Sequence, residues 1–117
     1  MMQRYRLAAC AEGHLPRRIA LLLDGAMRFL HVAALAIEAG DLARKTRSVE
    51  RALRIVGHLR ATLDFERGGE IAEKYDALYV EVAGVALSAS ATLDAGGLRR
   101  AAGALGEVYA AWCEFVK

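Results

Sequence analysis

Three breaks divide the chain into four long runs in which apolar residues recur every three or four positions. The breaks are Gly40-Asp41, the stretch 64–69 and the stretch 94–97, and each contains glycine. Apolar residues at this spacing lie on one face of an α-helix. Glycine is typical of a helix end and an acid of the next helix start. The predicted helices run from Pro16 to about Ala39, from Leu42 to about Leu63, from near Glu70 to the third break, and from Leu98 onward.

Each predicted helix has one apolar face that should enter a shared core. In the second run this face repeats about every seven residues, which favours left-handed bundle packing. Four helices with short links pack as an all-α, antiparallel up-down-up-down four-helix bundle. The 117 residues, 56% of them apolar, suit a single domain over residues 1–117. The expected core residues, in chain order, are Ile19, Leu22, Ala26, Phe29, Leu30, Ala33, Ile37, Leu42, Val49, Ala52, Val56, Leu59, Leu63, Ile71, Tyr75, Leu78, Val82, Val85, Ala89, Leu98, Ala101, Ala102, Leu105, Val108, Tyr109, Trp112 and Val116.

Two helices carry more apolar residues than one core face can bury. At about 100° per residue, a second set on the first helix lies outside the expected core face, and the third helix has a second row almost opposite its core face. Contiguous apolar surface on a small protein is typical of a partner site. Alternatively, the first helix is the most enclosed element, and scattered exposed leucines have no function. These surplus residues are Leu21, Leu23, Met27, Val32, Ala34 and Leu35, and then Val80, Ala83, Leu87 and Ala91.

Charge is unevenly distributed although the net charge is only +2. Residues 43–60 contain six Lys/Arg and one Glu, whereas residues 66–81 contain five acids and two bases. The two segments either attract each other as neighbouring helices or form two solvated faces. No aromatic residues alternate with the basic ones, so nucleic-acid binding is not expected.

The sequence predicts a cytoplasmic protein that does not insert into a membrane. The longest uncharged run, 82–93, is too short to span a bilayer, and the N-terminus lacks the apolar core of a signal peptide. Cys10 and Cys113 have no CxxC spacing, and two reduced thiols are favoured over a bridge between the ends.

No pattern of catalytic, metal-binding or cofactor-binding residues emerges. His14, His31 and His58 are far apart, and neither HExxH nor a glycine-rich phosphate motif is present. Acids at 64, 66 and 70 lack the spacing of a calcium loop and suit helix capping better. We expect no enzyme activity, cofactor or metal, although a metal-dependent enzyme is retained as an alternative.

Four motifs occur in the order and spacing of a known family. They are "LLLDGAMRFLHVAALAIEAGD" (21–41), "LDFERGGEIA" (63–72), Leu78-Tyr79 and "AAWCEF" (110–115). Together they resemble the flagellar export chaperone family that binds flagellin (FliS) over nearly the whole chain. The chain departs from this pattern at Leu23, where the family usually has tyrosine, and in the short segment before Pro16.

The resemblance implies a four-helix-bundle chaperone without enzymatic activity. Such a chaperone holds the disordered C-terminal segment of flagellin in apolar grooves, prevents premature polymerisation, and delivers its client to the cytoplasmic domain of the flagellar export gate. In the family, a tyrosine-bearing N-terminal segment can cover part of the apolar site, which corresponds here to residues 1–15. The partner-binding residues expected here are Tyr5, Leu7, Leu23, Met27, Val80 and Leu87.

Two further questions stay open at the level of sequence. A helical-bundle adaptor of another secretion or signalling system would present the same grooves to a different partner. A weak homodimer is also compatible with the surplus apolar rows.

Overall fold

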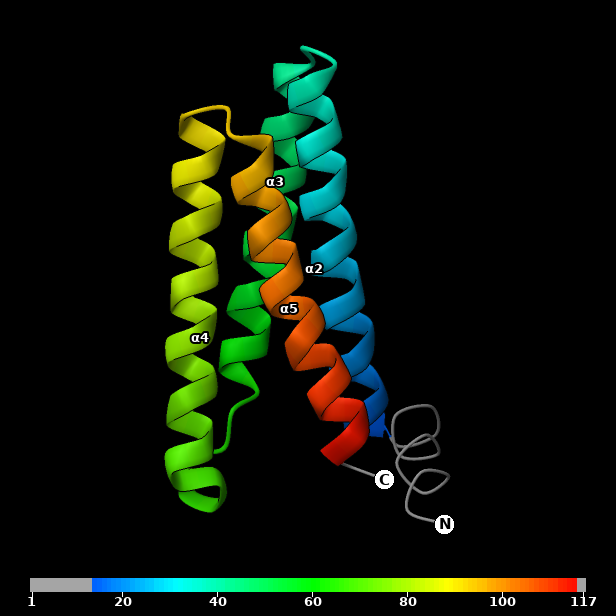
Figure 1. Ribbon diagram of the computed structural model, residues 1–117. Helices are drawn as coiled ribbons and strands as arrows, with labels where there is room; N and C mark the ends of the chain where they lie inside the picture. The colour runs from blue at the N-terminus through cyan, green and yellow to red at the C-terminus, as the bar shows by residue number, and fades with distance from the viewer. Residues whose placement is uncertain (1–13, 116–117) are drawn as a thin grey trace.

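The computed structural model describes residues 14–115, which form an antiparallel four-helix bundle (Figure 1). Each helix packs against its two neighbours in a ring, and α2 makes the most extensive contacts, with α3 and α5. Within residues 14–115 no strand is present. The predicted all-α, up-down-up-down architecture is therefore confirmed. The helices are α2 (His14–Glu38), α3 (Leu42–Ala61), α4 (Phe65–Ala91) and α5 (Ala95–Phe115).

An aspartate caps the start of each helix that follows a link. In every case the carboxylate accepts a hydrogen bond from the backbone N–H three residues further on, which would otherwise lack a helical partner. This repeated cap explains why each link ends where it does. The bonds are Arg44 N–H to Asp41 (3.1 Å), Arg67 N–H to Asp64 (3.0 Å) and Gly97 N–H to Asp94 (3.0 Å).

The first link has the predicted glycine-terminated form. Gly40 adopts a φ of +75°, and the Asp41 N–H donates to the Ala36 carbonyl at 2.8 Å. This positive-φ ending satisfies carbonyls that the helix leaves without partners.

The second link differs from the prediction, because α4 begins at Phe65 rather than near Glu70. α3 ends at Ala61, with Thr62 as its C-cap, and Asp64 already caps the first turn of α4. Gly69 then takes φ 49° and ψ −123°, a backbone conformation that essentially only glycine adopts, and bends the helix. Glycine here redirects α4 instead of ending α3.

The third link also corrects the sequence analysis. Leu93 adopts the positive φ, +55°, while Gly96 and Gly97 belong to the first turn of α5. A Cβ on Gly97 would lie 2.7 Å from the Cβ of Ala89. Gly97 is therefore required by close packing of α5 on α4 and does not end a helix.

The core of α2 is wider than predicted. Leu23 and Ala34, which we expected outside the core, are each 0% exposed. Both neighbours, α3 and α5, enclose α2, so residues on two sides of the helix become buried. The alternative that α2 is simply the most enclosed element is correct for these two residues.

Three residues expected in the core are exposed instead. Ile71 is 59% exposed, and Leu42 and Tyr109 also lie at the surface. Leu42 is the first residue of α3, and Ile71 follows the bend at Gly69 near the start of α4, so both lie close to an end of the bundle. Trp112 is half-buried, and the other expected core residues between 17 and 113 are buried or packed against the core.

Two ion pairs join neighbouring helices. Arg99 of α5 donates two hydrogen bonds to Glu38 of α2, each at 2.8 Å, and this lowers the pKa of the Glu38 carboxyl. Arg60 of α3 donates to Asp76 of α4 at 2.7 Å, which raises the pKa of Arg60. Both pairs are exposed to solvent, so they fix register more than they stabilise the fold.

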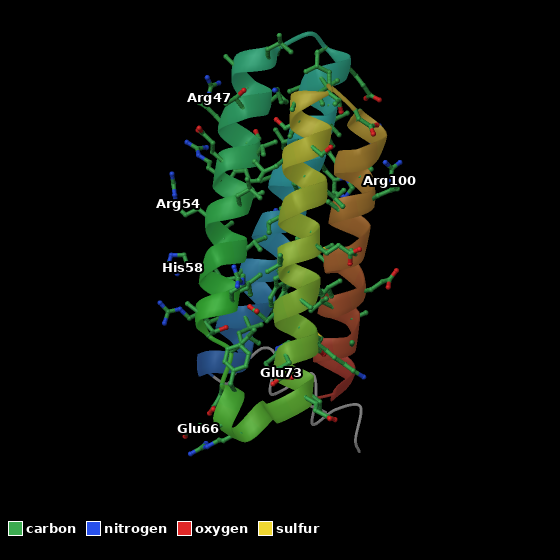
Figure 2. All side chains as sticks on the ribbon, turned by 90° about the vertical axis from the view of Figure 1, so that its left-hand side faces the viewer. Arg47, Arg54, His58, Glu66, Glu73 and Arg100 are labelled. Carbon is green, nitrogen blue, oxygen red and sulfur yellow. The ribbon has the colours of Figure 1, made fainter. Side chains whose placement is uncertain are left out.

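The basic segment of α3 forms mostly a solvated face. Arg47, Arg54 and His58 point away from the bundle along the outer edge of α3 (Figure 2). Among residues 14–115, Arg60–Asp76 is the one ion pair between α3 and α4. Mutual attraction between the two helices is therefore a minor part of the charge pattern.

One helix is long and apolar enough to cross a membrane by length and composition. It covers the 22 residues Arg17–Glu38 of α2. In the bundle α3 and α5 enclose one side of this helix, while Leu21 and Leu35 are 59% and 60% exposed, as the sequence analysis expected for its surplus apolar residues.

Candidate partner-binding surfaces

An apolar row runs along the solvent-facing side of α4. Its members are spaced three or four residues apart, so they form one continuous line on the helix. Val80 is 47% exposed and Leu87 is 56% exposed, whereas Ala83, which we had included in this row, is packed against the core. We call this line the outer row, and its exposed residues are Ala77, Val80, Gly84, Leu87 and Ala91.

An apolar cavity lies at the end of the bundle where α2 and α4 begin and α3 and α5 end. Its volume is about 530 Å³, within the range of protein ligand sites. All four of the helices contribute, either directly or through the link between α3 and α4. We call it the end cavity, and the side chains that define it are Ile19, Leu23, Ile71, Tyr75, Tyr79 and Trp112.

The bend in α4 shapes the mouth of this cavity. Asp64, Arg67 and Gly68 border it, and they belong to the capped turn that precedes Gly69. Because Gly69 redirects the chain after one turn, this turn and the rest of α4 line the same cavity. The Asp64 carboxylate caps α4 and lies 3.7 Å from the Arg67 guanidinium, which confirms the capping interpretation for this acid.

Tyr79 is the most deeply buried polar side chain in the end cavity. It is 3% exposed, and its ring stacks on Tyr75 with centroids 6.4 Å apart. Burial, with a smaller contribution from Tyr75, raises the pKa of the Tyr79 phenol to about 12. The hydroxyl is therefore protonated throughout the neutral range.

The structure separates the predicted site residues into three groups. Val80 and Leu87 are exposed on α4, as expected for a partner surface. Leu23 is a core residue, but it also forms part of the end-cavity wall. Met27 is partly buried between α2 and α5, with its Cε 3.3 Å from where a Cβ on Gly106 would lie.

The remaining two predicted residues, Tyr5 and Leu7, lie outside the described residues. In the part of the chain that the structure describes, no three His, Cys, Asp or Glu side chains form a group that could hold a metal ion.

Comparison with known proteins identifies the family. The chain matches the family described as "Flagellar protein FliS" over residues 1–117. The chain belongs to the FliS family. It is 36% identical over 95 residues to the flagellar secretion chaperone FliS of Salmonella typhimurium, covering 80% of this chain and 70% of the relative. It is 32% identical over 105 residues to the flagellar secretion chaperone FliSB of Pseudomonas aeruginosa, covering 90% and 83% respectively. These names describe flagellar export chaperones, not enzymes.

The four motifs that carry the FliS resemblance converge on the end cavity. Motif 63–72 supplies its mouth, including Ile71, and the first-helix motif supplies Leu23. Leu78-Tyr79 supplies Tyr79, and the C-terminal motif supplies Trp112. Sequence spacing alone missed this site, because the prediction treated the exposed rows as the binding surface and Tyr79 lay outside the expected core face. The shared motifs were the available signal, since they mark four distant segments that meet at one place.

Proposed function

We propose that this chain is a cytoplasmic, flagellin-specific export chaperone that binds the disordered C-terminal segment of flagellin. The observation that carries the proposal is the convergence of the four FliS motifs on the end cavity. The family membership favours a flagellar export client, and the cavity and outer row offer it apolar surface.

The two apolar surfaces suit a long, flexible client. The outer row can accept the apolar face of an amphipathic helix, since its residues repeat at helical spacing. The end cavity is an apolar hollow at one end of the bundle, about 530 Å³ in volume. A segment that occupied both would wrap around α4 and fold on binding, which prevents premature polymerisation by sequestering its apolar residues.

The N-terminal segment is proposed as a competitor for the client. α2 starts at the end of the bundle where α4 also starts and α5 ends (Figure 1), and the residues that line the end cavity belong to this end. Tyr5 and Leu7 would then cover part of the cavity in the free chaperone. Replacing Tyr5 with alanine should tighten client binding if this segment acts as a lid, whereas weaker binding would mean that Tyr5 contacts the client.

Delivery of the complex to the cytoplasmic domain of the flagellar export gate completes the proposed role. Surface plasmon resonance with that domain immobilised compares the free chain with its flagellin complex. Stronger binding of the complex supports delivery, and equal or absent binding of both contradicts it. A weak homodimer of the free chain would be detected by sedimentation equilibrium.

Suppression of flagellin polymerisation tests the chaperone function directly. Seeded polymerisation of flagellin, followed by light scattering, should stop when one equivalent of the chain is added. The double variant Val80→Asp/Leu87→Asp should lose most of this effect while keeping its helical circular dichroism, because both side chains are exposed.

Leu93→Asp is the matched control. Leu93 is 47% exposed, as is Val80, but it lies in the turn between α4 and α5. Suppression should be unchanged in this variant. If the unsubstituted chain does not suppress polymerisation, yet binds a different secretion or signalling protein through the outer row, the adaptor alternative is correct.

A further inference from the structure

The hydroxyl of Tyr79 is a buried polar group in a mostly apolar wall. Tyr79 is 3% exposed and lines the end cavity. Buried tyrosine hydroxyls normally have a hydrogen-bond partner, because an unpaired one loses its bonds to water without replacement. Among residues 14–115, no hydrogen bond joins the Tyr79 hydroxyl to another group.

The polar neighbours at the cavity do not fill this role. Asp64 accepts the N–H of Arg67 at 3.0 Å and lies 3.7 Å from its guanidinium, and neither side chain bonds to the Tyr79 hydroxyl. The stacked Tyr75 also lines the cavity, but it is only half-buried. The Thr62 hydroxyl donates to the Leu59 carbonyl at 2.7 Å. Apart from Trp112, the remaining side chains of the wall are aliphatic, Leu23 among them.

We infer that the end cavity recognises a two-part feature of the client: an apolar side chain beside a polar group that hydrogen-bonds to the Tyr79 hydroxyl. This inference rests on the proposed function and adds a rule for client selection. The aliphatic wall alone would accept any apolar residue of suitable size. The hydroxyl adds selectivity, because a client without a matching polar group leaves the hydroxyl without a hydrogen-bond partner.

The chemistry of the polar group restricts the conformation of the client at this point. Carbonyl groups in the middle of a helix are already bonded within that helix. A free carbonyl occurs in an extended stretch or in the last turn of a helix, and an amide side chain offers equivalent chemistry. The end cavity therefore takes a stretch of client where a helix ends or is absent, or where Asn or Gln flanks the apolar residue. The outer row, by contrast, suits the middle of a helix.

Removing the hydroxyl while keeping the ring tests this inference. Calorimetric titration compares the full chain with Tyr79→Phe and Tyr75→Phe, using the C-terminal segment of flagellin from the same organism as the probe. Tyr79→Phe should weaken binding about three- to tenfold, the usual value of one hydrogen bond. Tyr75→Phe, the matched control from the same cavity, should bind within about twofold of the unsubstituted chain.

Thermal unfolding of the free variants supplies the second readout. The midpoint of Tyr79→Phe should be equal to or higher than that of the unsubstituted chain, since no bond inside residues 14–115 is lost. A purely structural role for the hydroxyl would instead lower the midpoint.

Each other outcome has a distinct meaning. Equal affinity of Tyr79→Phe and the unsubstituted chain overturns this inference while leaving the proposed function intact. A lower midpoint for Tyr79→Phe also overturns it, because the hydroxyl would then have a partner within the free chain. If the unsubstituted chain does not bind the probe at all, the proposed function fails and this inference fails with it.

Discussion

Truncating Leu23 should destabilise the bundle by an amount that its position allows us to calculate. Leu23 is 0% exposed, and Leu23→Ala removes three buried carbons at about 0.8 kcal/mol each, or roughly 2.4 kcal/mol in total. A sealed void would add a further cost. Leu23 also lines the end cavity, so the space joins an existing hollow instead of forming a sealed void, and this second cost stays small. We expect the free energy of unfolding to fall by about 2–3 kcal/mol.

Urea unfolding followed by circular dichroism measures this loss. Leu87→Ala is the control, because Leu87 is 56% exposed and should change the unfolding free energy by no more than about 0.5 kcal/mol. A loss below about 1 kcal/mol for Leu23→Ala, or equal losses in the two variants, would refute the placement of Leu23 in the core. In a later binding study, comparing Leu23→Ala with Leu87→Ala distinguishes loss of binding through loss of stability from loss of a surface contact.

Three further predictions address the backbone and the buried phenol. Gly97→Ala should lower stability by about 1–3 kcal/mol in urea unfolding, because its Cβ would lie 2.7 Å from that of Ala89; an unchanged stability contradicts the close packing of α4 and α5. Gly69→Ala should cost about 1–2 kcal/mol through backbone strain, whereas Gly57→Ala, inside α3 with nothing within 4 Å of its Cβ, should gain about 0.5–1 kcal/mol; changes of the same sign in both would contradict the bend. The fold favours neutral Tyr79 and raises its pKa from 10.0 to about 12, so its contribution is complete below pH 10 and is lost as the pH rises through 12; of a total of roughly 3 kcal/mol, about 2 kcal/mol is lost by pH 11.5. Unfolding at pH 9 and 11.5 should show this loss in the unsubstituted chain but not in Tyr79→Phe, and parallel losses would place the titration elsewhere.

The helix pattern was sufficient to predict the bundle, because it depends on local spacing. Apolar periodicity located four helices, and Gly40 ended the first of them as expected. The later links could not be placed so well. A glycine in sequence is compatible with a helix end, a bend or a close contact, and Gly69 and Gly97 serve the last two purposes. Tertiary packing decides among these, and it is not a local property.

Which residues belong to the candidate site depends on how far each helix is rotated about its own axis, and the sequence does not specify this rotation. The exposure of Val80 and Leu87 was predicted correctly because they lie far from the core face of α4. Leu23 lies near the boundary of the α2 core face, so a small rotation toward α5 buries it. Tyr79 was missed because spacing placed the core face of α4 slightly to one side of its position. The end cavity itself forms only when four separate segments meet.

Calorimetric titration of the full chain with the C-terminal segment of flagellin is the most direct test of the account. We predict one-to-one binding tighter than about 1 μM, or roughly −8 kcal/mol, with a large negative heat-capacity change from burial of apolar surface and folding of the client. Absence of binding heat at several temperatures, from a chain whose circular dichroism is fully helical, would contradict the account and leave a FliS-family bundle that serves another client.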